Sequence, residues 1–140
     1  MNKYLVKKKD AKYLRRLLVL GRVEWTEEID SKGKIWFSTD IEEERFKRLA
    51  KGAKADRKAE EEEGFLSVKF EMNPKKPGVV HCMRAMMDRC SIRRIDEETM
   101  HKYIRLMEEE NNCKYTDEEI EEKWILKVSR AEVEDSTNNS

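Results

Sequence analysis

The stretch VVHCMRAMMDRC, from Val79 to Cys90, decides how the second half of the chain folds. At about 100° per residue on a helical wheel, its valine, methionine and cysteine side chains fall on one arc roughly 160° wide. His81, Arg84 and Asp88 fall on the other side. One apolar arc is typical of an amphipathic helix with a single buried side. The pattern therefore predicts a helix whose sulfur-containing side chains pack in the core.

The same wheel bears on metal binding by this stretch. His81 would point about 180° away from Cys90 on a regular helix, so the two side chains could not share an ion. The spacing of Cys82, Cys90 and Cys113 also differs from the compact cysteine pairs of structural zinc sites. We therefore expect neither a metal nor another cofactor.

Working outward from this stretch, local signals predict the remaining elements. Asp96 and Thr116 are good N-cap residues for two further helices. On the other side, the proline-containing segment NPKKPG is the strongest break in the chain. The predicted elements are a helix after Asp10, a hairpin at 22–39 that turns at Gly33, a helix from about 41, a strand at 65–72, and helices at 79–90, 96–111 and 116–130.

This order predicts an α+β fold. A small antiparallel sheet, made of the hairpin 22–39 and the strand 65–72, would pack against helices, and the C-terminal half would consist of three helices. We expect residues 1–134 to form a single compact domain, with lobes 1–72 and 79–134 joined by 73–78, and 135–140 to be a flexible tail. Residues 54–63 carry a weak apolar stripe and predict an exposed helical extension.

Composition limits the class of protein. Charged residues make up 43% of the chain, against roughly 25% in an ordinary soluble domain. No apolar run approaches the roughly 20 residues that a membrane-spanning helix needs. The three cysteines, together with a start that has no apolar signal region, favour thiols in a reducing compartment. We expect a cytoplasmic protein with no membrane association.

Charge is unevenly distributed along the chain, although the formal net charge is zero. Residues 1–22 carry eight Lys or Arg against one Asp, whereas residues 107–140 carry four against eleven Asp or Glu. The acidic candidates for a protein interface are Glu118, Glu119, Glu121, Glu122, Glu60 and Glu61. The basic candidates for nucleic-acid binding are Lys7, Lys8, Lys9, Lys12, Arg15, Arg16, Lys75 and Lys76.

These surfaces predict two alternative functions. The first is a non-catalytic protein-interaction module, regulatory or inhibitory, whose acidic helical surfaces bind a partner with a basic groove, such as a nucleic-acid-handling protein. The second is direct DNA or RNA binding through the basic N-terminal segment and the stretch 75–94. The helix predicted at 116–130 opens with acids that phosphate would repel, which favours the protein partner.

The sequence contains no recognisable catalytic constellation. Its five glycines build no phosphate-binding loop, and no serine or cysteine lies in a nucleophile signature. His101 falls outside the apolar face of its predicted helix, beside Glu97 and Arg105. We therefore expect no catalytic residues and no enzyme activity.

Overall fold

The computed structural model describes residues 1–63, 66–73, 75–86 and 89–126. Their helix and strand content confirms the predicted α+β class. The elements are β1 (Asn2–Val6), α1 (Lys8–Leu20), β2 (Trp25–Ile29), β3 (Ile35–Thr39), α2 (Glu43–Glu63), β4 (Ser67–Met72), β5 (Val79–Met86), β6 (Arg89–Asp96), α3 (Glu97–Asn111), α4 (Asp117–Trp124) and β7 (Ile125–Leu126).

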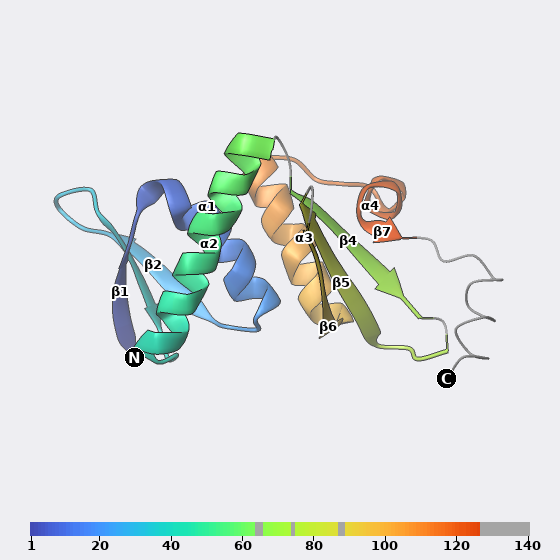
Figure 1. Cartoon of the computed structure of the whole chain (residues 1–140), viewed down its shortest axis with the longest axis horizontal. Helices are drawn as coiled ribbons and strands as arrows, with labels where there is room; N and C mark the ends of the chain where they lie inside the picture. The colour runs from blue at the N-terminus through green and yellow to red at the C-terminus, as the bar shows by residue number, and fades with distance from the viewer. Residues whose placement is uncertain (64–65, 74, 87–88, 127–140) are drawn as a thin grey trace.

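The strands form two separate sheets. The first has the order β1-β3-β2 and is antiparallel throughout. The second has the order β6-β5-β4-β7, with β7 running parallel to β4. Helices α1, α2 and α3 lie between the two sheets (Figure 1). Each sheet therefore buries the face that it turns toward this helical layer.

The hairpin of the first sheet forms where local signals predicted it. Strand β2 pairs with β3 from Trp25 opposite Thr39 to Ile29 opposite Ile35. Gly33 adopts a φ of 78° in the connecting turn, a left-handed conformation that favours glycine. Phe37 is fully buried beneath the helices. This hairpin prediction is confirmed.

The N-terminal segment differs from the prediction. Residues 2–6 form strand β1, which pairs with β3, and α1 begins at Lys8 with Lys7 as its N-cap. Asp10, predicted to be the N-cap, lies inside the helix and is buried. Its carboxylate accepts a hydrogen bond from Arg57 at 2.5 Å. Asp10 therefore pairs with a residue of α2 instead of capping α1. The local sequence around Asp10 does not indicate this distant partner.

Helix α1 contributes to both hydrophobic cores. Leu14, Leu17 and Leu18 pack with Phe37 and Phe46 in the core of the first sheet. Leu20, the last residue of α1, packs with the core residues of the second sheet. Helix α1 therefore connects the two halves of the fold through its apolar side chains.

Helix α2 is longer and more buried than the sequence indicates. It continues without a break to Glu63, and its face at Ala53, Asp56 and Arg57 is buried. The predicted exposed extension at 54–63 is therefore wrong for this face. Charged residues can be buried here because each has a partner, Asp10 for Arg57 and Arg84 for Asp56.

The described residues of the stretch Val79–Cys90 form strands and not the predicted helix. Its residues up to Met86 form β5, which pairs with β6 on one side and β4 on the other. Val80 and Cys82 alternate toward the core, while Val79, His81 and Met83 point to the opposite face. Apolar residues occupy both faces of β5, so its sequence pattern fits an amphipathic helix as well as it fits a strand. Cys82 is buried as predicted, but Cys90 is exposed.

Two further predictions about the arrangement are corrected. The strand predicted at 65–72 does not join the hairpin 22–39, because β4 pairs with β5 and places Phe70 opposite Cys82. The predicted linker 73–78 therefore lies between two strands of one sheet. The C-terminal half contains two helices within the described residues, not three. Whether residues 1–134 fold as one domain stays a prediction.

The caps predicted for the last two helices are confirmed. Asp96 accepts a hydrogen bond from the Thr99 amide at 2.7 Å at the start of α3. Thr116 and Glu119 form a capping box at the start of α4. Helix α4 ends at Trp124, earlier than the predicted Arg130. The predicted tail 135–140 lies outside the described residues. None of the described helices is long and apolar enough to cross a membrane.

Candidate binding surfaces

Helix α4 is anchored by its C-terminal tryptophan. Trp124 is buried among Phe70, Tyr103 and Ile104, and Tyr115 packs edge-on against it with ring centroids 4.5 Å apart. Lys123 lies over both of these rings, 5.0 Å from each centroid. This anchor holds the opposite face of α4 toward solvent.

The four predicted acidic residues of α4 are all exposed, but they have different roles. Glu119 accepts a hydrogen bond from the Thr116 amide at 3.2 Å and so stabilises the helix start. The other three, Glu118, Glu121 and Glu122, line one groove of about 590 Å³.

Apolar and basic residues complete this groove, which we call the acidic groove. Ile125 and Leu126 of β7 form an aliphatic wall, and the Leu126 residue is 40% exposed. Lys69 of β4 also lines the groove, and its ammonium donates a hydrogen bond to the Lys123 carbonyl. Three carboxylates thus face one lysine beside exposed aliphatic surface.

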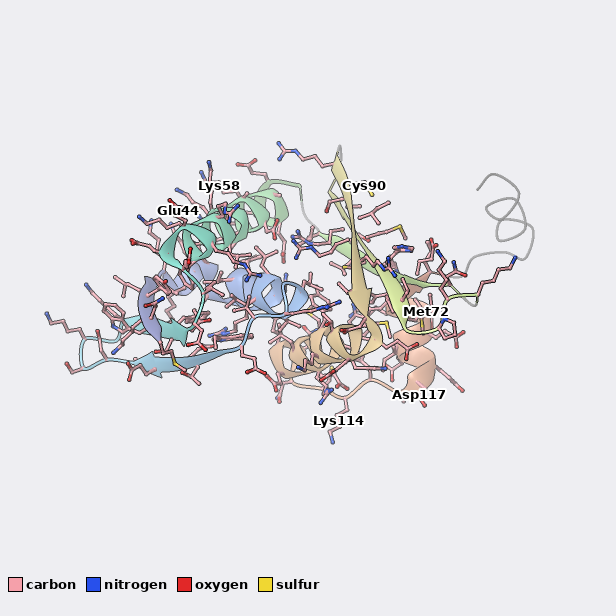
Figure 2. All side chains as sticks on the ribbon, turned by 90° about the horizontal axis from the view of Figure 1, so that it is seen from below. Glu44, Lys58, Met72, Cys90, Lys114 and Asp117 are labelled. Carbon is pink, nitrogen blue, oxygen red and sulfur yellow. The ribbon has the colours of Figure 1, made fainter. Side chains whose placement is uncertain are left out.

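The other two acidic candidates bind residues of the same chain. Glu60 lies 3.4 Å from the Arg16 guanidinium, and Glu61 lies 3.1 Å from that of Arg57. Both carboxylates lie on α2, which Figure 2 shows on the other side of the molecule from Asp117 at the start of α4. Glu60 and Glu61 therefore do not extend the acidic groove.

Two of the basic candidates are also engaged inside the molecule. Arg15 makes two hydrogen bonds to Glu27, at 2.7 and 2.8 Å. Arg16 binds Glu110 of α3 at 3.0 Å as well as Glu60, and its side chain is 13% exposed. These ion pairs reduce the charge that helix α1 can offer to phosphates.

The remaining basic candidates are exposed but do not form one patch. Lys7, Lys8 and Lys9 lie at the start of α1, and Lys12 lies over the Tyr13 ring at 5.2 Å. Lys75 and Lys76 are exposed between β4 and β5, in the other half of the fold. In the rest of the 75–94 stretch, Arg84 binds Asp56, whereas Arg89, Arg93 and Arg94 are exposed on the edge strand β6.

The structure gathers a lysine cluster that the sequence analysis missed. Lys51 and Lys54 of α2 line a groove of about 310 Å³ together with Lys7. We call this the lysine groove. Lys47, Lys51 and Lys54 recur at spacings of four and three residues, which places them on one helical face. The sequence spacing could have indicated that Lys51 and Lys54 lie on one face of a helix. That Lys7 lies near them could be known only from the folded structure.

A third cleft lies where α1, β2 and the start of α3 meet. It has a volume of about 520 Å³ and is lined by Val19, Val23 and half-buried Trp25. Four charged residues of its lining form two ion pairs, Arg22 with Asp96 at 3.5 Å and Lys102 with Glu98 at 3.5 Å. Its charged groups are thus largely matched by partners within the chain.

The thiols and imidazoles are dispersed. Burial raises the pKa of Cys82 to about 11, so this thiol is held in its protonated form at neutral pH. His81 lies on β5, and His101 is exposed on α3. Among the described residues, no group of three or more His, Cys, Asp or Glu side chains is arranged to hold a metal ion.

No protein-family model, curated protein or solved structure matches this chain. The function proposed below therefore rests on the geometry of the chain itself.

Proposed function

We propose that this protein is a non-catalytic protein-interaction module, regulatory or inhibitory, that binds a basic segment of a partner protein in the acidic groove. The observation that supports this proposal is the gathering of Glu118, Glu121 and Glu122 beside the exposed aliphatic surface of Leu126. A partner segment with Lys or Arg side chains flanking an apolar one would match both the charge and the aliphatic wall.

Helix stability alone does not account for this acidic face. Acidic residues in the first turn of a helix are favoured by its dipole, and Asp117, Glu118 and Glu119 lie there in α4. Glu121 and Glu122 lie in the last turn, where the dipole disfavours negative charge. Glu122, a carboxylate kept at an unfavourable helix end, supports a role in binding a cation from outside.

The groove also favours a protein over a nucleic acid as the partner. Its three carboxylates would repel phosphate groups. A bound phosphate backbone would also leave the aliphatic wall exposed to water. A nucleic-acid-handling partner would offer basic side chains for the same groove. By occupying such a basic surface, this protein would prevent the partner from binding its nucleic acid. This is the inhibitory form of the proposal.

Photocrosslinking tests the proposal directly. Leu126 is replaced by a photoreactive phenylalanine analogue, and the protein is irradiated in extract of its source cells. Ile29, 72% exposed on the first sheet, carries the same analogue in the matched control. We expect a protein to crosslink from position 126 but not from position 29, and to be lost with Glu118→Lys/Glu122→Lys. Equal crosslinking from both positions, or insensitivity to the charge reversals, would count against the acidic groove.

A further inference from the structure

The lysine groove combines an apolar floor with a basic rim. Its floor is formed by Val6 of β1, Leu14 of α1 and three residues of α2, Phe46, Ala50 and Ala53. Leu5, 51% exposed, extends the apolar surface at the edge strand β1. Four of these floor residues are buried, so the apolar surface open to an occupant comes mainly from Leu5 and half-buried Ala50.

The rim carries positive charge that the described part of the chain does not balance. Lys7, Lys51 and Lys54 are exposed, and none forms an ion pair with another residue that the structure describes. Asp10 also lines the groove, but its carboxylate is bound to Arg57 and its side chain is only 11% exposed. An occupant would therefore meet three ammonium groups and a carboxylate that is already paired.

This combination discriminates between two kinds of anion. Nucleic acid would bind the three ammonium groups through its phosphates but would leave the exposed side chain of Leu5 in contact with water. A peptide segment with acidic side chains around an apolar one would pair with the lysines of the rim and cover Leu5 at the same time.

We propose that the lysine groove binds an acidic, apolar-containing segment of a second partner protein. This site is separate from the acidic groove, because α4 does not line it and its charge is of the opposite sign. Figure 2 shows Lys58 of α2 and Asp117 of α4 on opposite sides of the molecule. A chain that carries both sites brings a basic segment and an acidic segment together on one scaffold.

Selection from a displayed library of random peptides tests this proposal. The peptides have about twelve residues, enough for roughly three helical turns. The full chain and its Lys51→Glu/Lys54→Glu variant are the immobilised targets. Lys58→Glu changes an exposed lysine of the same helix outside the groove and is the matched control. Leu5→Ser removes part of the apolar wall without changing charge, and thermal melting checks that each variant is folded.

The proposal predicts a peptide family with Asp or Glu around a large apolar residue. Its members should bind the wild-type chain and Lys58→Glu alike but bind Lys51→Glu/Lys54→Glu and Leu5→Ser at least about tenfold more weakly, a change of roughly 1.4 kcal/mol. Three results would overturn the proposal. The selected peptides could be purely acidic and bind Leu5→Ser as well as the wild type, Lys58→Glu could weaken their binding equally, or no acidic family could be selected at all. Salt-sensitive self-association of the chain abolished by Lys51→Glu/Lys54→Glu would also overturn it, because it would make a second copy the occupant.

Discussion

The Arg16 guanidinium of α1 lies 3.0 Å from the Glu110 carboxylate of α3, and both side chains are largely buried, with 13% and 12% of their surfaces exposed. The two residues are 94 positions apart in the sequence; α1 contributes to both hydrophobic cores, whereas α3 contributes to the core of the second sheet. This ion pair, with Glu60 of α2 3.4 Å from Arg16, links three helices of the central layer. Arg16 therefore serves the fold, although its charge and sequence position had suggested a ligand.

Replacing Arg16 by methionine tests this structural role. Removing one partner leaves the largely buried Glu110 carboxylate without its cation, so Arg16→Met should lower the free energy of unfolding by about 3 kcal/mol. Neutralising the orphaned carboxylate in Arg16→Met/Glu110→Gln should recover part of this loss. Urea unfolding monitored by circular dichroism measures both changes. A neutral effect of Arg16→Met would contradict the structural role of the pair.

Thiol reactivity distinguishes the observed strands from the helix predicted at 79–90. In the native chain Cys90 and Cys113 should react with a thiol reagent, whereas Cys82 should react only after unfolding. Cys82 is 1% exposed, and burial raises its pKa to about 11, so it offers almost no thiolate at neutral pH. Mass spectrometry of the labelled peptides identifies each site. Protection of Cys82 and Cys90 together would instead indicate one buried helical face.

The Arg15–Glu27 pair predicts a dependence of stability on pH. Burial opposes ionisation of Glu27, but hydrogen bonds from Arg15 and Trp25 outweigh it and lower the pKa of this carboxyl below its ordinary value. Its contribution is therefore complete above the ordinary glutamate pKa of about 4.3 and is lost as the pH falls through the lowered value. Glu27→Gln should be less stable than the wild type at pH 7, and the difference should disappear on acidification.

Urea unfolding of both proteins at a series of pH values measures this difference. Glu28→Gln is the control on the same strand, because Glu28 pairs with Lys3 at a more exposed position and should contribute at most about 1 kcal/mol. A stability difference between wild type and Glu27→Gln that persisted at the acid end would rule out the lowered pKa as its source.

Direct nucleic-acid binding should be weak. Arg15 and Arg16 are held by carboxylates of the same chain, and Lys75 and Lys76 lie in the other half of the fold from Lys7. Labelled DNA and RNA duplexes should therefore bind with dissociation constants no tighter than about 10⁻⁴ M at physiological salt. Fluorescence anisotropy between about 50 and 200 mM salt measures this, and an affinity loss of roughly 10³-fold across the range would favour the nucleic-acid alternative.

Local signals predicted much of this fold, and long-range contacts account for most of the differences. The turn at Gly33 and the caps at Asp96 and Thr116 depend on a few neighbouring residues, so the sequence shows them directly. The strand β5 carries apolar residues on both faces because it lies in the middle of a sheet, and only its pairing with β4 and β6 distinguishes it from a helix.

The candidate sites differ in the same way: some depend on local sequence, and others depend on contacts between distant segments. Glu118 and Glu122 lie on one short helix, so the exposure of both could be predicted from local sequence. Arg15 and Arg16 were predicted to bind a ligand because their partners, Glu27 and Glu110, come from elements that the sequence does not place beside α1. The lysine groove was missed for the same reason, since Lys7 meets Lys51 only in the folded chain.

The most direct test of the acidic groove is a nuclear magnetic resonance titration of the isotope-labelled chain with a lysine-rich amphipathic peptide, a method that detects even weak binding. The account predicts amide shifts concentrated in α4, β7 and around Lys69, and their loss in Glu118→Lys/Glu122→Lys but not in Glu109→Lys, an exposed acid of α3. Shifts centred on the cleft at Trp25, or spread evenly over all acidic surfaces, would contradict it.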